Sequence, residues 1–254
     1  MTLKKSLEPL EPLTGALVFI FIWWLCTSLK LVDPILLPSP QASAKAMWTG
    51  LTTGTLMHDM IITIRRTIYA FLIAVVICVP LGLVLGSSAR IYRSCEFVID
   101  FFRSTPASAL FPLFLVILGV GENTKVAVAA FGAGLLILFN TAYGVMNARK
   151  VRQAAARVMG ASSLKILGGV TLLESLPQTF VGMRSGISFS LVIVIVAEMF
   201  IGSTDGLGQR VINAQMIFNM PEMYATIFSA GALGYGLNLL FILAERHFVH
   251  WGGK

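Results

Sequence analysis

Long stretches without a charged residue limit the folds open to this chain more than any other feature of its sequence. Two stretches, residues 67–89 and 126–148, contain no Asp, Glu, Lys or Arg at all. About 20 apolar residues in a helix cross the hydrocarbon core of a bilayer. Charged residues make up only 12% of the chain, against about 25% in soluble domains. The sequence therefore predicts a protein that crosses a membrane several times.

The apolar runs predict about six transmembrane helices in one all-α membrane domain that covers residues 1–254. At roughly 20 residues a helix, the length leaves little room for a separate soluble domain. Three prolines between the first two spans (Pro34, Pro38 and Pro40) predict that no continuous helix fills residues 32–59. The predicted spans are 13–31, 60–86, 97–119, 124–146, about 184–201, and 223–244.

The distribution of lysine and arginine predicts the orientation. The net charge is +7, which in a membrane protein indicates basic cytoplasmic loops rather than nucleic-acid binding. With both termini in the cytoplasm, 13 of the 19 basic residues fall on the cytoplasmic side. These 13 are Lys4, Lys5, Arg90, Arg93, Arg103, Arg149, Lys150, Arg152, Arg157, Lys165, Arg184, Arg246 and Lys254.

The predicted cytoplasmic loop between the fourth and fifth spans, residues 147–172, has an unusual composition, and we call it the basic loop. Residues 149–159 fit a short amphipathic helix, with its basic and apolar side chains on opposite faces. Gly160 is expected to end this helix, and Ser162 or Ser163 to cap a second one. The pattern fits a helix on the inner leaflet and a rigid knob that docks into a partner equally well.

A motif in the basic loop resembles the cytoplasmic signature of the permease subunits of bacterial ABC importers. That signature is Glu-Ala-Ala, three residues, Gly, nine residues, Ile, one residue, then Leu-Pro. Aligned on Gly160, Ala155, Ala156 and Leu172 match, and Val170 replaces the isoleucine. Two positions depart from the signature, because Ala154 replaces the acidic residue and Leu173 replaces the proline.

The resemblance extends over most of the chain and is closest to the nitrate, sulfonate and taurine branch of these permeases. It is carried by four segments in the same order and spacing as in that branch: DPILLPSP, FFRSTPASALFPLFLVILGVGENTK, AEMFIGSTDGLGQRV and MYATIFSAGALGYGLNLLFILAERHFVHW. It implies a MetI-like helical fold in the bacterial inner membrane, and a permease homodimer.

The resemblance also implies that the basic loop, as a coupling helix, docks into a groove of an ABC ATPase present in two copies. Nucleotide and Mg²⁺ would be bound by that ATPase, since this chain has no G-x-x-x-x-G-K-[ST] phosphate-binding motif. The chain itself would then be neither an enzyme nor a cofactor-binding protein, and its scattered histidines predict no metal site. The implied ATPase contacts are Arg152, Ala154, Ala155, Arg157, Gly160, Ala161 and Ser162.

The implied cargo is a small anion such as a sulfonate, taurine or nitrate, delivered by a periplasmic or lipid-anchored binding protein. An importer for bicarbonate or a pyrimidine precursor, and an ion-coupled secondary transporter, are the alternatives. An ion-coupled secondary transporter would normally carry more ionisable residues at membrane depth. The candidate pore or gating residues are Arg103, Pro106 and Glu198.

Three further features have simpler interpretations. An internal ion pair is the alternative role for Glu198. Arg65 and Arg66, at the outer end of the second span, are expected to extend to lipid head groups; the alternative is that they guide an anion through the pore or contact a binding protein. Gly82 and Gly86 form a G-x-x-x-G pattern on the same span and predict close helix packing.

Overall fold

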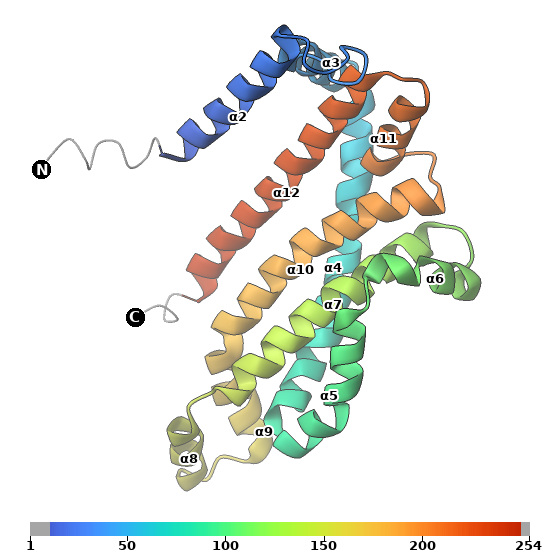
Figure 1. The fold of residues 1–254 in the computed structure, drawn as a ribbon. Helices are drawn as coiled ribbons and strands as arrows, with labels where there is room; N and C mark the ends of the chain where they lie inside the picture. The colour runs from blue at the N-terminus through green and yellow to red at the C-terminus, as the bar shows by residue number, and fades with distance from the viewer. Residues whose placement is uncertain (1–10, 250–254) are drawn as a thin grey trace, which may run out of the picture.

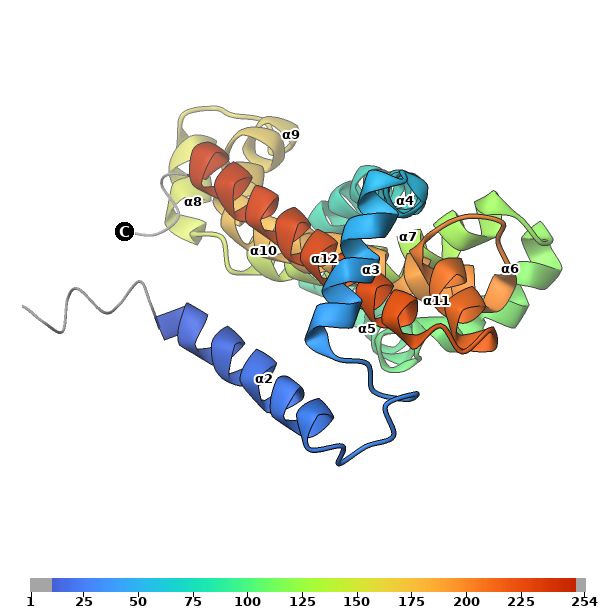
Figure 2. The same ribbon diagram turned by 90° about the horizontal axis from the view of Figure 1, so that it is seen from above.

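The computed structural model of the protein describes residues 11–249, with side chains from residue 14 onward. Lys4, Lys5 and Lys254, which contribute to the predicted orientation, lie outside this part. All regular elements within it are helices (Figures 1 and 2). They are α2 (Glu11–Ser28), α3 (Pro40–Thr52), α4 (Thr55–Ser87), α5 (Ala89–Ser104), the 3₁₀ turn η2 (Ala107–Leu110), α6 (Phe111–Leu118), α7 (Glu122–Met146), α8 (Lys150–Val158), α9 (Ser163–Ile166), the π-helical turn η3 (Leu167–Thr171), α10 (Leu172–Ile201), α11 (Leu207–Met216) and α12 (Met220–Phe248).

The centre of the molecule is the packing of α7 between α4 and α10. Glycines let these backbones approach closely, as the G-x-x-x-G pattern on α4 predicts. A Cβ atom added at Gly82 would lie 2.7 Å from the Cβ of Thr141, and one added at Gly86 only 2.5 Å from the carbonyl oxygen of Ala142. On the α10 side, one added at Gly182 would lie 2.6 Å from the Cβ of Asn140. Small residues at helix contacts are how membrane helices associate closely.

Four helical stretches are long and apolar enough to cross a membrane: α4, α7, the run from α9 through α10, and α12. The bent pair of α5 and α6 makes a fifth if the two halves are counted together. The apolar part of α2 that the structure describes, Thr14–Ser28, falls short of the length required. The all-helical membrane fold is therefore confirmed, but the described residues give four or five spans rather than about six.

The predicted third span, 97–119, is not one straight helix. It is divided between α5 and α6, which meet at an angle of 93°. The break lies at Thr105 and Pro106, where Thr105 is extended with φ −83° and ψ 124°. A residue before proline is driven out of the helical region by contact with the proline ring. Pro106, one of the candidate pore residues, is thus the residue that forms the bend.

The predicted start of the fifth span was wrong, whereas the prediction that no continuous helix fills residues 32–59 is confirmed. The fifth span was expected to begin near residue 184, but α10 begins at Leu172 and includes Pro177. Its polar residues find partners inside the bundle, as when the Gln178 amide donates to Asn140 Oδ1 at 2.8 Å. In the proline-rich segment, helix α3 begins at Pro40, where the missing N–H costs no hydrogen bond. The other two prolines lie outside that helix.

Helix α2 lies apart from the central bundle (Figure 2). Trp23 of α2 contacts later segments: its indole N–H donates to the carbonyl of Pro38 at 3.0 Å, and its ring stacks on Phe228 of α12. Most of the other apolar side chains of α2 are exposed. This surface is suited to lipid or to another protein chain rather than to water.

Candidate functional site

The basic loop folds as two short helices joined by a glycine turn. Helix α8 covers Lys150–Val158, within one residue of the predicted 149–159 at each end. Gly160 has φ +80°, a left-handed conformation that favours glycine, and the N–H of Ala161 closes the turn on the carbonyl of Ala156 at 3.0 Å. Ser162 then caps α9, as its hydroxyl accepts from the N–H of Lys165. The predicted glycine stop and serine cap are confirmed.

The outer surface of the basic loop is apolar and exposed. Four large side chains, Val151, Val158, Met159 and Leu164, are 80–89% exposed. Ala154 and Ala155 are exposed as well, whereas Ala156 is buried. The loop contains five basic residues and no acid: Arg149, Lys150, Arg152, Arg157 and Lys165. We call these exposed apolar side chains the apolar patch; α8 and α9, which carry the patch and basic residues beside it, lie at one end of the molecule (Figure 1).

A carboxylate from outside the loop contacts α8. Glu174, in the first turn of α10, accepts the backbone N–H of Arg149 at 2.6 Å and Nη1 of Arg152 at 2.8 Å. The side chain of Glu174 is only 10% exposed. Sequence reasoning missed this residue, although its position one residue after the end of the motif could have drawn attention to it.

The loop is also held away from part of the bundle. A cavity of about 630 Å³ separates it from the ends of α4 and α7. Gly86 and Ser87 line one side of this cavity, and Lys150, Arg157 and Leu164 line the other. The loop thus projects from the bundle rather than lying flat on it.

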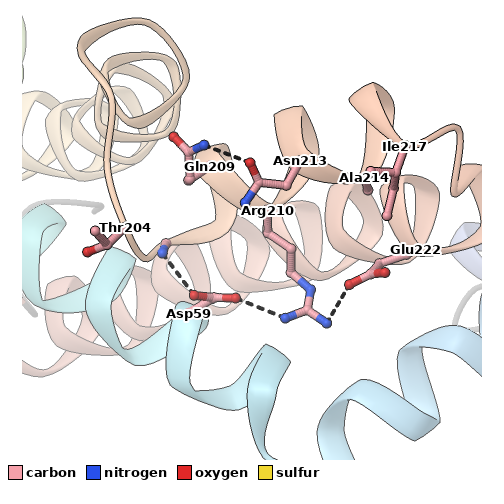
Figure 3. Close-up of a pocket in the computed structure, with 9 residues that line it drawn as sticks. Asp59, Thr204, Gln209, Arg210, Asn213, Ala214, Ile217 and Glu222 are labelled. Carbon is pink, nitrogen blue, oxygen red and sulfur yellow. Dashed lines mark hydrogen bonds and ion pairs between the residues drawn. The ribbon is translucent and has the colours of Figure 1, made fainter.

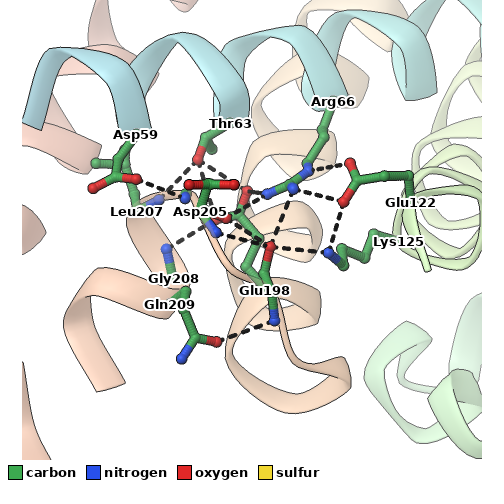
Figure 4. Close-up of polar contacts among 12 residues, drawn as sticks. Asp59, Thr63, Arg66, Glu122, Lys125, Glu198, Asp205, Leu207, Gly208 and Gln209 are labelled. Atoms are coloured by element: carbon green, nitrogen blue, oxygen red, sulfur yellow. Dashed lines mark hydrogen bonds and ion pairs between the residues drawn. The ribbon is translucent and has the colours of Figure 1, made fainter. Parts of the chain in front are cut away.

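A second polar site lies at the far end of α10, where Arg66 of α4 binds two carboxylates (Figure 4). Its Nε and Nη2 donate to the two oxygens of Glu122, each at 2.6 Å, and its Nη1 donates to Glu198 at 2.7 Å. The side chain of Arg66 is 4% exposed and that of Glu198 is fully buried. The expectation that Arg66 extends to head groups was therefore wrong, while Arg65 beside it is exposed.

The same cluster fixes the segment between α10 and α11. Glu198 also accepts from the hydroxyl of Thr63 at 3.0 Å and from the backbone N–H of Gly208 at 2.9 Å. Lys125 donates to Glu122 at 2.9 Å and to the hydroxyl of Ser203 at 3.0 Å. We call Thr63, Arg66, Glu122, Lys125, Glu198 and Ser203 the polar cluster. Its two cations and two anions balance, which is how buried charges in a membrane protein are tolerated.

A small polar pocket of about 170 Å³ adjoins the polar cluster (Figure 3). Arg210 of α11 bridges Asp59 of α4 at 2.9 Å and Glu222 of α12 at 2.7 Å. Asp59 also accepts the N–H of Gly206 at 2.9 Å. The ion pairs of Arg210 therefore connect α4 and α11 to α12. His58 and Asp205 approach Asp59, but its two oxygens already serve Gly206 and Arg210, and we assign no metal to this group.

The three candidate pore residues do not come together. Arg103 is half-exposed, pairs with Asp100 at 3.3 Å and lies 5.0 Å from the centroid of the Phe139 ring on α7. Glu198 contacts the Arg66–Glu122 pair at the other end of α7, about 25 Å away along the helix at 1.5 Å a residue. Pro106 forms the bend between α5 and α6. These residues occupy separate places.

Comparison with known proteins agrees with this architecture. Residues 78–251 match the family described as binding-protein-dependent transport system inner membrane component. A probable ABC transporter permease protein of Brucella melitensis biotype 1 is 31% identical over 230 residues, which cover 90% of this chain and 92% of the relative. The taurine transport system permease protein TauC of Escherichia coli K12 is 27% identical over 242 residues, which cover 93% and 88% of the two chains.

A solved structure shows the same fold. The inward-facing MetNI methionine ABC transporter superimposes with a TM-score of 0.70 at 21% identity, over 78% of this chain and 97% of that one. The MetI-like helical fold is thereby confirmed. The chain belongs to the binding-protein-dependent transport system inner membrane component family, and it is a multi-pass inner-membrane permease subunit of an ABC transporter.

Proposed function

We propose that the basic loop is the surface on which this permease receives a separate ATPase subunit. The observation that carries the proposal is the exposed apolar patch of α8 and α9, held rigid by the turn at Gly160. Apolar side chains exposed to this degree mark an interaction site. ATP and Mg²⁺ would be bound by the partner, because the chain has no phosphate-binding motif of its own. The proposed contacts are Arg152, Ala154, Ala155, Arg157, Gly160, Ala161 and Ser162.

The charge of the loop defines the partner's surface. The loop that carries the apolar patch contains five basic residues and no acid. Electrostatic complementarity across interfaces sets specificity and association rate. The receiving groove of the ATPase is therefore expected to be apolar at its centre, with acidic side chains around it.

The complete importer would contain two copies of this permease, two ATPase subunits and a periplasmic or lipid-anchored binding protein. The family description, which names a binding-protein-dependent system, supports the last of these. In this assembly the basic loop faces the cytoplasm and both termini lie there, as the distribution of basic residues predicts. The polar cluster would then lie at the outer end.

The proposed cargo is a small anion of the sulfonate or taurine class. The support is the resemblance to a taurine permease over nearly the whole chain. The binding protein is expected to carry most of the selectivity, and the half-exposed Arg103 is the residue of this chain proposed to meet the anion. Titrating the cognate binding protein with taurine, nitrate, bicarbonate and a pyrimidine precursor tests this. Binding of only one of the last two would replace the sulfonate proposal.

Glu198 is proposed to act at the outer end without lining the pore. It is fully buried and joins α4, α10 and α11 through Thr63, Arg66 and Gly208. In this role it holds the segment between α10 and α11 in place. If the outer end of the permease opens, the segment between α10 and α11 must either move together with the outer ends of α4 and α10 or lose its contacts with Glu198.

Replacement of Gly160 by tryptophan tests the docking proposal. The left-handed turn disfavours any side chain, so the knob should be deformed and the ATPase should no longer copurify with the permease in mild detergent. Gly54→Trp is the matched control, since Gly54 has φ +81° and no atom within 4 Å of an added Cβ, as at Gly160. It should retain the ATPase. Retention by both variants, or solute transport without ATP, would contradict the proposal.

A further inference from the structure

We propose that Glu174 is a positioning residue that fixes the docking helix α8 to the transmembrane helix α10. The inference rests on the proposed function, because it concerns how a movement of the docked loop reaches the membrane helices. Glu174 does not belong to the exposed apolar patch. It contacts the start of α8, where the loop meets the bundle.

The carboxylate of Glu174 makes two contacts at the start of α8. Oε2 accepts the N–H of Arg149, the residue that precedes the helix, at 2.6 Å, and Oε1 accepts Nη1 of Arg152 in its first turn at 2.8 Å. An anion at a helix N-terminus is stabilised by the unpaired N–H groups and the helix dipole. The side chain of Glu174 is 10% exposed and that of Arg152 58% exposed, so solvent screens this ion pair more than it would a fully buried one.

The loop supplies no substitute for this carboxylate. Residues 147–172 contain no acid, and the side chain of Arg149 makes no capping hydrogen bond. Ala154 stands where the resembled signature has its acidic residue. Within the described part of the chain, Glu174 is the acid whose ion pair joins α8 to the rest of the molecule. The acid that contacts the start of α8 is thus in the first turn of α10.

The covalent route from α8 to α10 is a weak mechanical link by comparison. It passes through the π-helical turn η3, which contains the adjacent glycines Gly168 and Gly169. Cβ atoms added at these glycines would meet nothing within 4 Å, so no neighbouring residue contacts the turn at these two positions, whereas Thr171 at its end is buried. The cavity described above separates the loop from α4 and α7. A hydrogen bond from Gln153 to the hydroxyl of Thr171, at 3.2 Å, is a further contact with η3 itself.

These contacts assign Glu174 a definite task. When the ATPase displaces α8, the two contacts of Glu174 carry α10 with it and prevent η3 from absorbing the movement. Without the carboxylate, the ATPase still docks on the apolar patch and hydrolyses ATP, but less of each displacement reaches α10. Loss of Glu174 therefore lowers the amount of solute carried per ATP.

The test uses the complete transporter in proteoliposomes, with the ATPase and binding protein present. Glu174→Ala should keep the ATPase in unchanged stoichiometry while transport per ATP falls about fivefold or more, the lower end of ordinary coupling between sites. Hydrogen exchange in Lys150–Val158 should accelerate about 2- to 30-fold, as expected when a helix cap is lost. Glu174→Gln, which can still accept from Arg149 but has no charge, should give intermediate values.

The matched control is Glu245→Gln. Glu245 belongs to α12, and its carboxylate lies 3.6 Å from Arg184, which is farther along α10 than Glu174. The control variant should leave transport per ATP unchanged. The inference is overturned if Glu174→Ala retains the wild-type ratio and exchange, or if that variant alone loses the ATPase, which would make Glu174 a docking residue. Failure of the wild-type chain to bind any ATPase would instead refute the proposed function.

Discussion

Replacing Arg66 by methionine would leave the Glu198 carboxylate without its cation in a place that solvent does not reach. Glu198 would keep only the hydroxyl of Thr63 and the N–H of Gly208 as donors. Removing one partner of a buried ion pair costs about 3–5 kcal/mol. The converse change, Glu198→Leu, should cost less, because Arg66 still binds Glu122 through two hydrogen bonds.

The double variant separates the ion pair from its surroundings. With Arg66→Met and Glu198→Leu together no buried charge is left unpaired at this point, and replacing both partners of such a pair by apolar residues is often nearly neutral. The N–H of Gly208 and the hydroxyl of Thr63 lose their acceptor, which costs about 1–3 kcal/mol for each group that finds no other. The double variant should therefore lose less stability than the sum of the two single losses.

The measurement is the temperature at which half of the detergent-solubilised protein loses its monodisperse elution peak. For a chain of this length a loss of 1 kcal/mol lowers the melting temperature by about 2–4 °C, so Arg66→Met should lower it by about 6–20 °C. A double-mutant cycle then gives the coupling energy. If the double variant lost the sum of the two single losses, the pair would not be coupled and the described geometry would be refuted.

Three further outcomes follow from the packing and the charges. Gly86→Ala places a Cβ atom 2.5 Å from the backbone of α7 and should lower the melting temperature, whereas Gly231→Ala on α12, where an added Cβ meets nothing within 4 Å, should not; equal melting temperatures would contradict the close contact. Lys125→Met should cost about 1 kcal/mol, far less than Arg66→Met, because its partner Glu122 is half-exposed and keeps Arg66; a loss as large as that of Arg66→Met in the same thermal assay would contradict this. Raising the salt concentration from about 0.1 to 1 M should weaken binding of the ATPase to the immobilised permease, since the Debye length falls to about 3 Å; salt-independent binding would argue against an acidic groove.

The sequence predicted the helices whose limits depend on local patterns. The long uncharged runs correspond to α4 and α7, since hydropathy over some 20 residues suffices to locate a membrane helix. The extent of α8, the stop at Gly160 and the cap at Ser162 were also predicted. Each depends on residues within one turn of the chain, where backbone preference and capping dominate.

Features that depend on distant residues were not predictable in the same way. The burial of Arg66 depends on Glu122 and Glu198, which lie 56 and 132 positions farther along the chain. The early start of α10 depends on polar residues that find partners on α7, so hydropathy alone placed the boundary too late. The bend at Pro106 could have been inferred from the proline, but its angle depends on the packing of α6 against α7.

The contact between Glu174 and α8 has a consequence for how such permeases can be recombined. A chimera that exchanges residues 147–172 for the loop of a relative would transplant the whole signature, yet leave behind the carboxylate that holds it. If the incoming loop carries an acid at position 154, the recombined protein would hold that negative charge in addition to the one at position 174. The unit of exchange is therefore the loop together with the first turn of α10, and residues 149, 152 and 174 are expected to be inherited as one set.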